Sequence, residues 1–166
     1  MKKYTRSISI AVFICFIDSF VYSQGGIALL TVIIAMVILI PKILIALVKK
    51  NSQLCKQRIV IAGIYLLMAI MVFTAISMNN KLASKRADRL ILACNSYKEK
   101  YQKYPDTLEN LVPEFISRVP KAKFALSYSE FMYISRKDSH LLVYYAAPPF
   151  GRWVYKMETK SWGYLD

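Results

Sequence analysis

The sequence predicts an α+β protein in which three transmembrane helices come first and the third continues into a long helix packed on a small antiparallel sheet. Apolar residues concentrate in the first half of the 166-residue chain. Beyond the third apolar segment they recur with helical spacing, and from Phe124 onward they alternate with a period of two. We therefore expect a membrane domain in residues 1–80 and a folded domain in residues 81–166.

Three segments qualify as membrane spans by their apolar composition. Hydrophobic residues make up 56% of the chain and the mean hydropathy is +0.35, which is too apolar for an ordinary soluble domain. The three segments are residues 7–22, 27–48 and 59–78. Asp18 lies in the first segment, where a carboxylate is costly unless it is neutral, paired or close to the interface.

The distribution of basic residues sets the orientation of these segments, because Lys and Arg are enriched in cytoplasmic loops. The connection at residues 23–26 is uncharged and is expected outside. Everything after residue 80 is then also outside, which in a bacterial inner membrane is the periplasm. The residues that favour a cytoplasmic N-terminus and a cytoplasmic second loop are Lys2, Lys3, Arg6, Lys49, Lys50, Lys56 and Arg58.

The N-terminus also has features of a signal peptide. Basic residues within positions 2–6 precede an apolar core and then Val21-Tyr22-Ser23. The alternative to a retained first span is a signal peptide that is cleaved after Ser23. Asp18 inside the core favours an uncleaved first span. In both alternatives the C-terminal domain lies outside.

Residues 58–104 are expected to form one continuous helix, half in lipid and half in water. Pro105 disfavours a helical conformation at Tyr104 and ends this helix. The half in water carries apolar residues at alternating steps of four and three, which places them on one face that must pack against the rest of the domain. This stripe comprises Ala83, Ala87, Leu90, Cys94, Tyr97 and Tyr101.

A short helix and several antiparallel strands are expected next. Asp106, with Glu109 three residues later, has the spacing of a helix capping box. Alternating apolar residues separated by turn signals then predict a meander of three or four strands. The expected strand segments are residues 126–133, 140–146, 153–157 and 161–166.

A Tyr-Pro-x-x-Leu-x-x-Leu element at residues 104–111 joins the long helix to the meander, accompanied by Tyr97, Tyr101, Val119-Pro120 and the strand aromatics. Residues 59–166 thereby resemble the type IV pilin-like fold, and are most similar to the pseudopilins of type II secretion. The resemblance implies a periplasmic domain that contacts other envelope proteins. Family members carry a peptidase cut site and a glutamate five residues into the mature helix. Gly63 is followed by no such glutamate and two spans precede it, so no prepilin peptidase cleavage is expected.

The sequence does not favour an enzyme, a metal site or a nucleic-acid-binding surface. His140 is the only histidine, and without a neighbouring ligand cluster it is expected at a solvent-facing strand start, with no metal and no cofactor. No phosphate-binding loop or nucleophile motif occurs. The net charge of +13 comes partly from residues that set the topology, so no nucleic acid is expected as a partner. The sequence identifies no small-molecule substrate. Cys15, Cys55 and Cys94 fall in different compartments and should not pair.

The third predicted strand and the turn before it carry a candidate protein-binding patch. The strands hold more aromatic side chains than one face of a small sheet can bury, and Trp, Tyr and Arg are the usual anchors of protein interfaces. The candidate residues are Phe150, Arg152, Trp153, Tyr155 and Lys156.

Two non-enzymatic functions fit these expectations, and both require a bilayer and a periplasmic protein partner. In the first, the chain is an inner-membrane-anchored envelope protein whose pseudopilin-like domain binds another envelope or secretion protein. In the second, it is a membrane-anchored immunity protein that neutralises a periplasmic toxic effector by direct binding.

The predicted topology can be tested with reporter fusions. A reporter enzyme that is active only in the periplasm should be active when fused after Asp166 and silent when fused within residues 51–57, because the basic loop is retained in the cytoplasm. Enzyme activity in intact cells is the measurement. The opposite pattern of activity would refute the orientation.

Overall fold

The computed structural model describes residues 2–166, which divide into an N-terminal unit that ends at Ile76 and a C-terminal unit from Ser77 to Asp166. The sequence had placed this boundary after residue 80. The chain is an α+β protein in which long helices precede a four-stranded antiparallel sheet. Each unit is described separately below.

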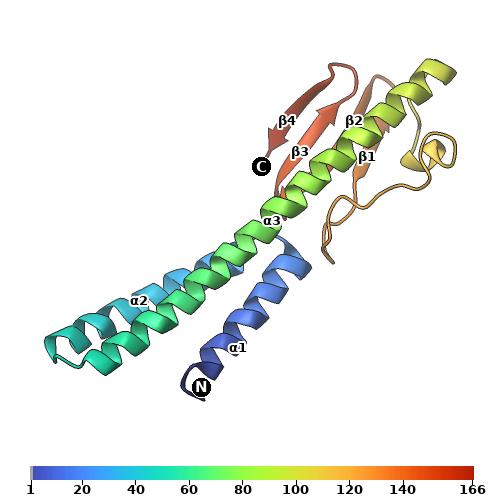
Figure 1. Ribbon diagram of the computed structural model, residues 1–166. Coiled ribbons are helices and arrows are strands. Elements are labelled where there is room, and N and C mark those ends of the chain that lie inside the picture. The colour runs from blue at the N-terminus through green and yellow to red at the C-terminus, as the bar shows by residue number, and fades with distance from the viewer. Residues whose placement is uncertain (1) are drawn as a thin grey trace. The chain divides into compact units, whose positions relative to one another are not determined.

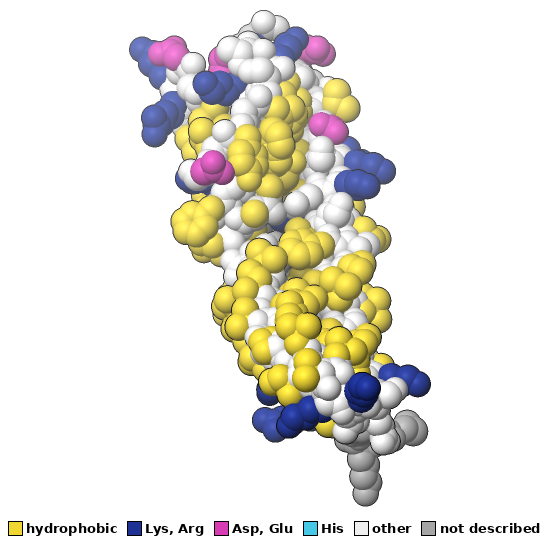
Figure 2. All heavy atoms as spheres, turned by 90° about the vertical axis from the view of Figure 1, so that its left-hand side faces the viewer, with side chains coloured by type: hydrophobic (Ala, Val, Ile, Leu, Met, Phe, Trp, Pro, Cys, Tyr) yellow, Lys and Arg dark blue, Asp and Glu magenta, His cyan; other side chains and the backbone are white. Residues whose placement is uncertain are grey.

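The N-terminal unit is helical. It contains α1 (Lys2–Phe16), the short π-helix η1 (Ile17–Tyr22), α2 (Gly26–Val48) and the first part of α3 (Ser52–Tyr101). Within residues 2–166, three helical segments are long and apolar enough to cross a membrane. On the face that Figure 2 shows, apolar side chains cover much of this unit, and basic side chains gather at one end of it.

Asp18 is fully buried and caps the N-terminus of α2. Its Oδ1 accepts a hydrogen bond from the backbone N–H of Gly25 at 3.0 Å, and its Oδ2 accepts one from Ala28 at 2.7 Å. The first N–H groups of a helix have no partner within the helix and form its positive end, so they are a suitable environment for a carboxylate. The partner of Asp18, which the sequence left open, is therefore the backbone of α2.

Close packing at Gly25 also depends on its lack of a side chain. Its φ of +76° lies in the left-handed region, and a Cβ atom would lie 2.8 Å from the Phe73 ring. Small residues at Ala11, Ala28 and Ala69 are buried where α1, α2 and α3 pack together. Such residues let apolar helices approach closely.

The C-terminal unit is built on the rest of α3. The sheet has the strand order β1 (Met132–Arg136), β2 (Ser139–Ala147), β3 (Phe150–Lys156) and β4 (Ser161–Leu165), with every neighbouring pair antiparallel. Figure 1 shows α3 crossing one face of this sheet. We call this the inner face and the opposite side the outer face.

The core of the C-terminal unit lies between α3 and the inner face. The predicted stripe residues Ala83, Ala87, Leu90 and Cys94 are buried, which confirms that this side of the helix packs on the rest of the unit. The stripe's last residue, Tyr101, is instead exposed. The sheet contributes Leu142, Tyr144 and Tyr155 to this core, and the turn after β3 contributes Met157.

The connection between α3 and the sheet differs from the sequence-based expectation in two places. The short helix is a single 3₁₀ turn, η2 (Leu108–Leu111), and its capping box is formed by Thr107 and Asn110 rather than by Asp106 and Glu109. The first strand begins at Met132 rather than at residue 126. Residues before it form a loop instead, because the N–H groups of Ala122 and Lys123 bond to the carbonyl of Ser129.

The packing of α3 on the sheet can be tested with two neighbouring leucines. Leu90 is 0% exposed, whereas Leu92 is 66% exposed on the same helix. Leu90→Ala should lower the free energy of unfolding by about 2–5 kcal/mol, because it removes buried methyl groups and leaves a cavity. Leu92→Ala is the control, and urea unfolding of a fragment comprising residues 81–166 is the measurement. Equal effects of the two substitutions would contradict this packing.

Candidate binding site

The alternation of β3 divides the predicted binding patch between two faces. Tyr155 and Trp153 share the inner face with core residue Leu142, because Leu142 pairs with Tyr155. Phe150, Arg152 and Lys156 lie on the outer face. The structure therefore does not bring the five predicted residues together on one surface.

The two inner-face residues are held by aromatic packing. Tyr155 is buried in the core, which is incompatible with a place on an exposed patch in this conformation. Trp153 lies in the middle of β3, between β2 and β4, and is partly exposed, with its ring centroid 5.0 Å from that of Tyr164 and 6.4 Å from that of Trp162. Period-two alternation, already visible in the sequence, separates both residues from Arg152.

The outer face has an apolar centre and basic residues around it. Val143 and Val154 are buried at its centre, while Phe150, at the edge, is 73% exposed. None of the residues that form strands β1 to β4 is acidic. The basic residues on the outer face are Arg136, Arg152 and Lys156.

Arg152 is the residue of this face with an unmet hydrogen-bonding requirement. Its guanidinium carbon lies 5.8 Å from the centroid of the Tyr145 ring, which in turn packs against Tyr128 at 4.8 Å. Its Nε is buried and has no hydrogen-bond acceptor among the described residues. A buried donor without an acceptor is destabilising. Nε itself is closed to solvent, so an external acceptor would bond to the other N–H groups of this half-buried guanidinium. Sequence reasoning placed Arg152 in the patch but did not include Tyr145, which lies beside it, or Tyr128, which packs on Tyr145.

His140 lies near the start of β2, as predicted, but its side chain pairs with Glu158 and is only 14% exposed instead of facing solvent. Its Nδ1 lies 2.7 Å from Oε1 of Glu158, which also accepts a hydrogen bond from the His140 backbone N–H at 2.9 Å. The ring packs beside that of Tyr104, with centroids 4.9 Å apart. Burial acts to raise the pKa of Glu158, but the hydrogen bonds from His140 outweigh it and the net shift is downward.

The His140–Glu158 pair lies in a polar hollow of about 660 Å³. Ser135 also lines this hollow and pairs with His140 across β1 and β2. The described contacts include no hydrogen bond between the Ser135 hydroxyl and the imidazole, so the nucleophile–base contact that a catalytic triad requires is not formed. No group of three or more His, Cys, Asp or Glu residues that could hold a metal ion occurs in the described part of the chain.

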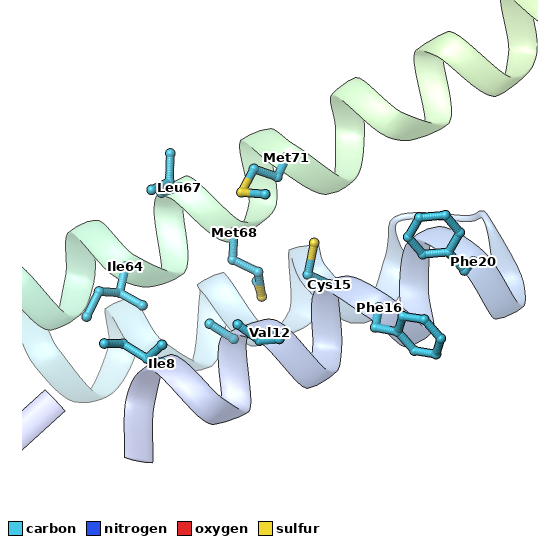
Figure 3. Close-up of a pocket in the computed structure, with 10 residues that line it drawn as sticks. Ile8, Val12, Cys15, Phe16, Phe20, Ile64, Leu67, Met68 and Met71 are labelled. Atoms are coloured by element: carbon cyan, nitrogen blue, oxygen red, sulfur yellow. The ribbon is translucent and has the colours of Figure 1, made fainter. Parts of the chain in front are cut away.

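A second hollow lies in the N-terminal unit. Figure 3 shows side chains of α1, η1 and α3 lining an apolar groove of about 400 Å³, among them Val12, Phe16 and Met68. The groove offers no polar side chain to orient a ligand, whereas specific small-molecule sites combine apolar walls with a few polar groups. Its chemistry fits hydrocarbon chains.

Lys123 is a buried cation in the C-terminal unit. It is 1% exposed, and its Nζ donates a hydrogen bond to the carbonyl of Ala146 at 2.9 Å. Burial lowers the pKa of this amine to about 8. The hydrogen bond ties the loop before β1 to the end of β2.

No protein-family model, curated protein or solved structure matches the chain. The functional argument therefore rests on the chain's own residues.

The buried amine predicts a pH-dependent stability. Because the folded protein releases the Lys123 proton near pH 8 and the unfolded chain near pH 10.5, the unfolded state binds more protons between these values. The free energy of unfolding should then rise by about 2 kcal/mol from pH 8 to pH 10.

Urea unfolding of the 81–166 fragment at a series of pH values measures this rise. Lys123→Met should remove it and raise the stability at pH 7, since an apolar side chain loses no charge solvation on burial. Lys121→Met, at an exposed position, is the matched control and should keep the rise. A wild-type fragment with constant stability from pH 8 to pH 10 would contradict the depressed pKa.

Proposed function

We propose that this chain is a non-enzymatic protein anchored in the bacterial inner membrane, with a C-terminal unit in the periplasm that binds another envelope or secretion protein. Three helices apolar enough to cross a membrane support the anchor. The orientation follows from the basic residues of the N-terminus and of the loop between α2 and α3.

The arrangement of the C-terminal unit supports a pilin-like architecture as part of this proposal. A long helix leaves an apolar segment, a Tyr104-Pro105 element follows it, and an antiparallel meander packs on one side of the helix. In the proposed role this unit presents its outer face to a partner while α3 covers the inner face.

The observation that carries the proposal is the unmet hydrogen-bonding capacity of Arg152 on a basic face with an apolar centre. Arg residues held against aromatic rings are frequent energetic centres of protein interfaces. A partner carboxylate would accept a hydrogen bond from Arg152 and complement the positive charge of Lys156. The partner surface that fits best is therefore apolar with acidic residues.

Photo-crosslinking in cells tests the proposal. A benzoylphenylalanine residue at Phe150 of the full-length protein should form a covalent adduct with a partner protein, because Phe150 is exposed beside Arg152. Arg152→Ala should reduce the adduct about fivefold or more, which corresponds to at least about 1 kcal/mol of binding free energy. The crosslinked segment of the partner, identified by mass spectrometry, should contain acidic residues.

Two matched variants control this experiment. Arg89→Ala removes the same charge from an exposed position on α3 and should leave the adduct unchanged. The photoreactive residue placed at Leu92, which is also exposed, should not form the same adduct. The proposal fails if Phe150 yields no adduct, or if Arg89→Ala and Arg152→Ala reduce it equally.

A further inference from the structure

The loop at residues 124–128 exposes three large apolar or aromatic side chains. Leu126 is 79% exposed, Phe124 is 64% exposed and Tyr128 is 44% exposed. Phe124 and Leu126 do not belong to the hydrophobic core between α3 and the sheet. We call residues 124–128 the apolar loop.

Two residues of α3 hold the apolar loop in place. Asn79 binds the backbone of Phe124 through both polar atoms of its side-chain amide. Its Oδ1 accepts a hydrogen bond from the Phe124 N–H at 3.2 Å, and its Nδ2 donates one to the Phe124 carbonyl at 3.4 Å. Arg86 donates from its Nη1 to the carbonyl of Lys121 at 2.7 Å, and its guanidinium carbon lies 4.7 Å from the centroid of the Phe124 ring. These contacts fix the level of the loop along the helix.

That level coincides with the end of the apolar segment of α3. Asn79 is the residue directly after Met78, where the apolar run 59–78 stops, and one residue adds about 1.5 Å along a helix axis. A helix that crosses a bilayer with this run therefore places Asn79 where the hydrocarbon meets the headgroups. The basic residues next to this level are Lys81, Lys85 and Lys121.

We infer that the apolar loop inserts into the interface of the bilayer, with Leu126 at the upper acyl chains, and with the Phe124 ring, packed on Arg86, and the neighbouring lysines at the level of the anionic headgroups. Aromatic and aliphatic side chains bind at this depth, and basic residues add attraction to anionic lipid. A protein partner would have to enter the same lipid layer to cover these side chains. The inference uses only the membrane anchoring of α3 and does not depend on the proposed partner at Arg152.

Lipid-quenching experiments on the full-length protein test this inference. The protein carrying Leu126→Cys is labelled with nitrobenzoxadiazole and reconstituted in vesicles of phosphatidylethanolamine and phosphatidylglycerol. Cys15 and Cys55 are replaced by alanine, whereas Cys94 is kept because burial raises the pKa of its thiol to about 12 and leaves it unreactive. Lys137→Cys, in the exposed turn between β1 and β2, is the control site.

The label at Leu126 should emit at shorter wavelength than the label at Lys137. Nitroxide lipids labelled near the headgroup should quench it at least about twofold more strongly. Asn79→Ala should weaken this quenching, because the loop loses both bonds to α3, while Asn80→Ala removes the same amide one residue further along and should leave quenching unchanged.

Two results would overturn the inference. Equal quenching at Leu126 and Lys137 would show that the loop lies in water. A blue-shifted emission at Leu126 that lipid nitroxides do not quench would show that a second copy of the chain, the other protein surface in these vesicles, covers the loop instead.

Discussion

The helix α3 must satisfy two different environments, and the rest of the structure follows from this requirement. Between residues 59 and 78 it is apolar on all sides, so hydrocarbon or other apolar helices can surround it. Its second part is apolar on one side only, and an isolated helix of that kind gains little stability until its apolar side is covered. The sheet covers that side. Asn79 lies where the apolar part of α3 meets the part that is apolar on one side only, and its side chain bonds to the backbone of Phe124.

Most of the fold could be predicted because it is encoded locally. The stripe that includes Leu90 and Cys94 follows from helical spacing, and the hairpins follow from turn signals and period-two alternation. The exceptions depend on contacts between residues distant in sequence. The loop before β1 is apolar enough to resemble a strand, but Lys123 binds the carbonyl of Ala146 and the loop closes on Ser129 instead. No local pattern shows where the amine of Lys123 will lie.

The candidate site was less predictable for the same reason. Composition identified the strand that contains Arg152, and period-two alternation is sufficient by itself to place this residue and Tyr155 on opposite faces. The Nε of Arg152 is buried without an acceptor, and the side chain packs on Tyr145. Both features depend on how β2 pairs with β3, which the sequence pattern defines only approximately. The partnership of His140 with Glu158 likewise joins residues 18 positions apart.

The capping of α2 by Asp18 has a consequence for biosynthesis. In the membrane anchor proposed above, a nascent chain would deliver α1 to the insertion machinery before α2 exists, and at that stage the Asp18 carboxylate has none of the backbone partners it later acquires from Gly25 and Ala28. An unpaired carboxylate resists transfer into hydrocarbon, whereas a carboxylate bonded to a helix N-terminus does not present a bare charge. We therefore expect the first two helices to leave the insertion machinery together as a preassembled hairpin, with the short turn between them formed before either helix meets lipid.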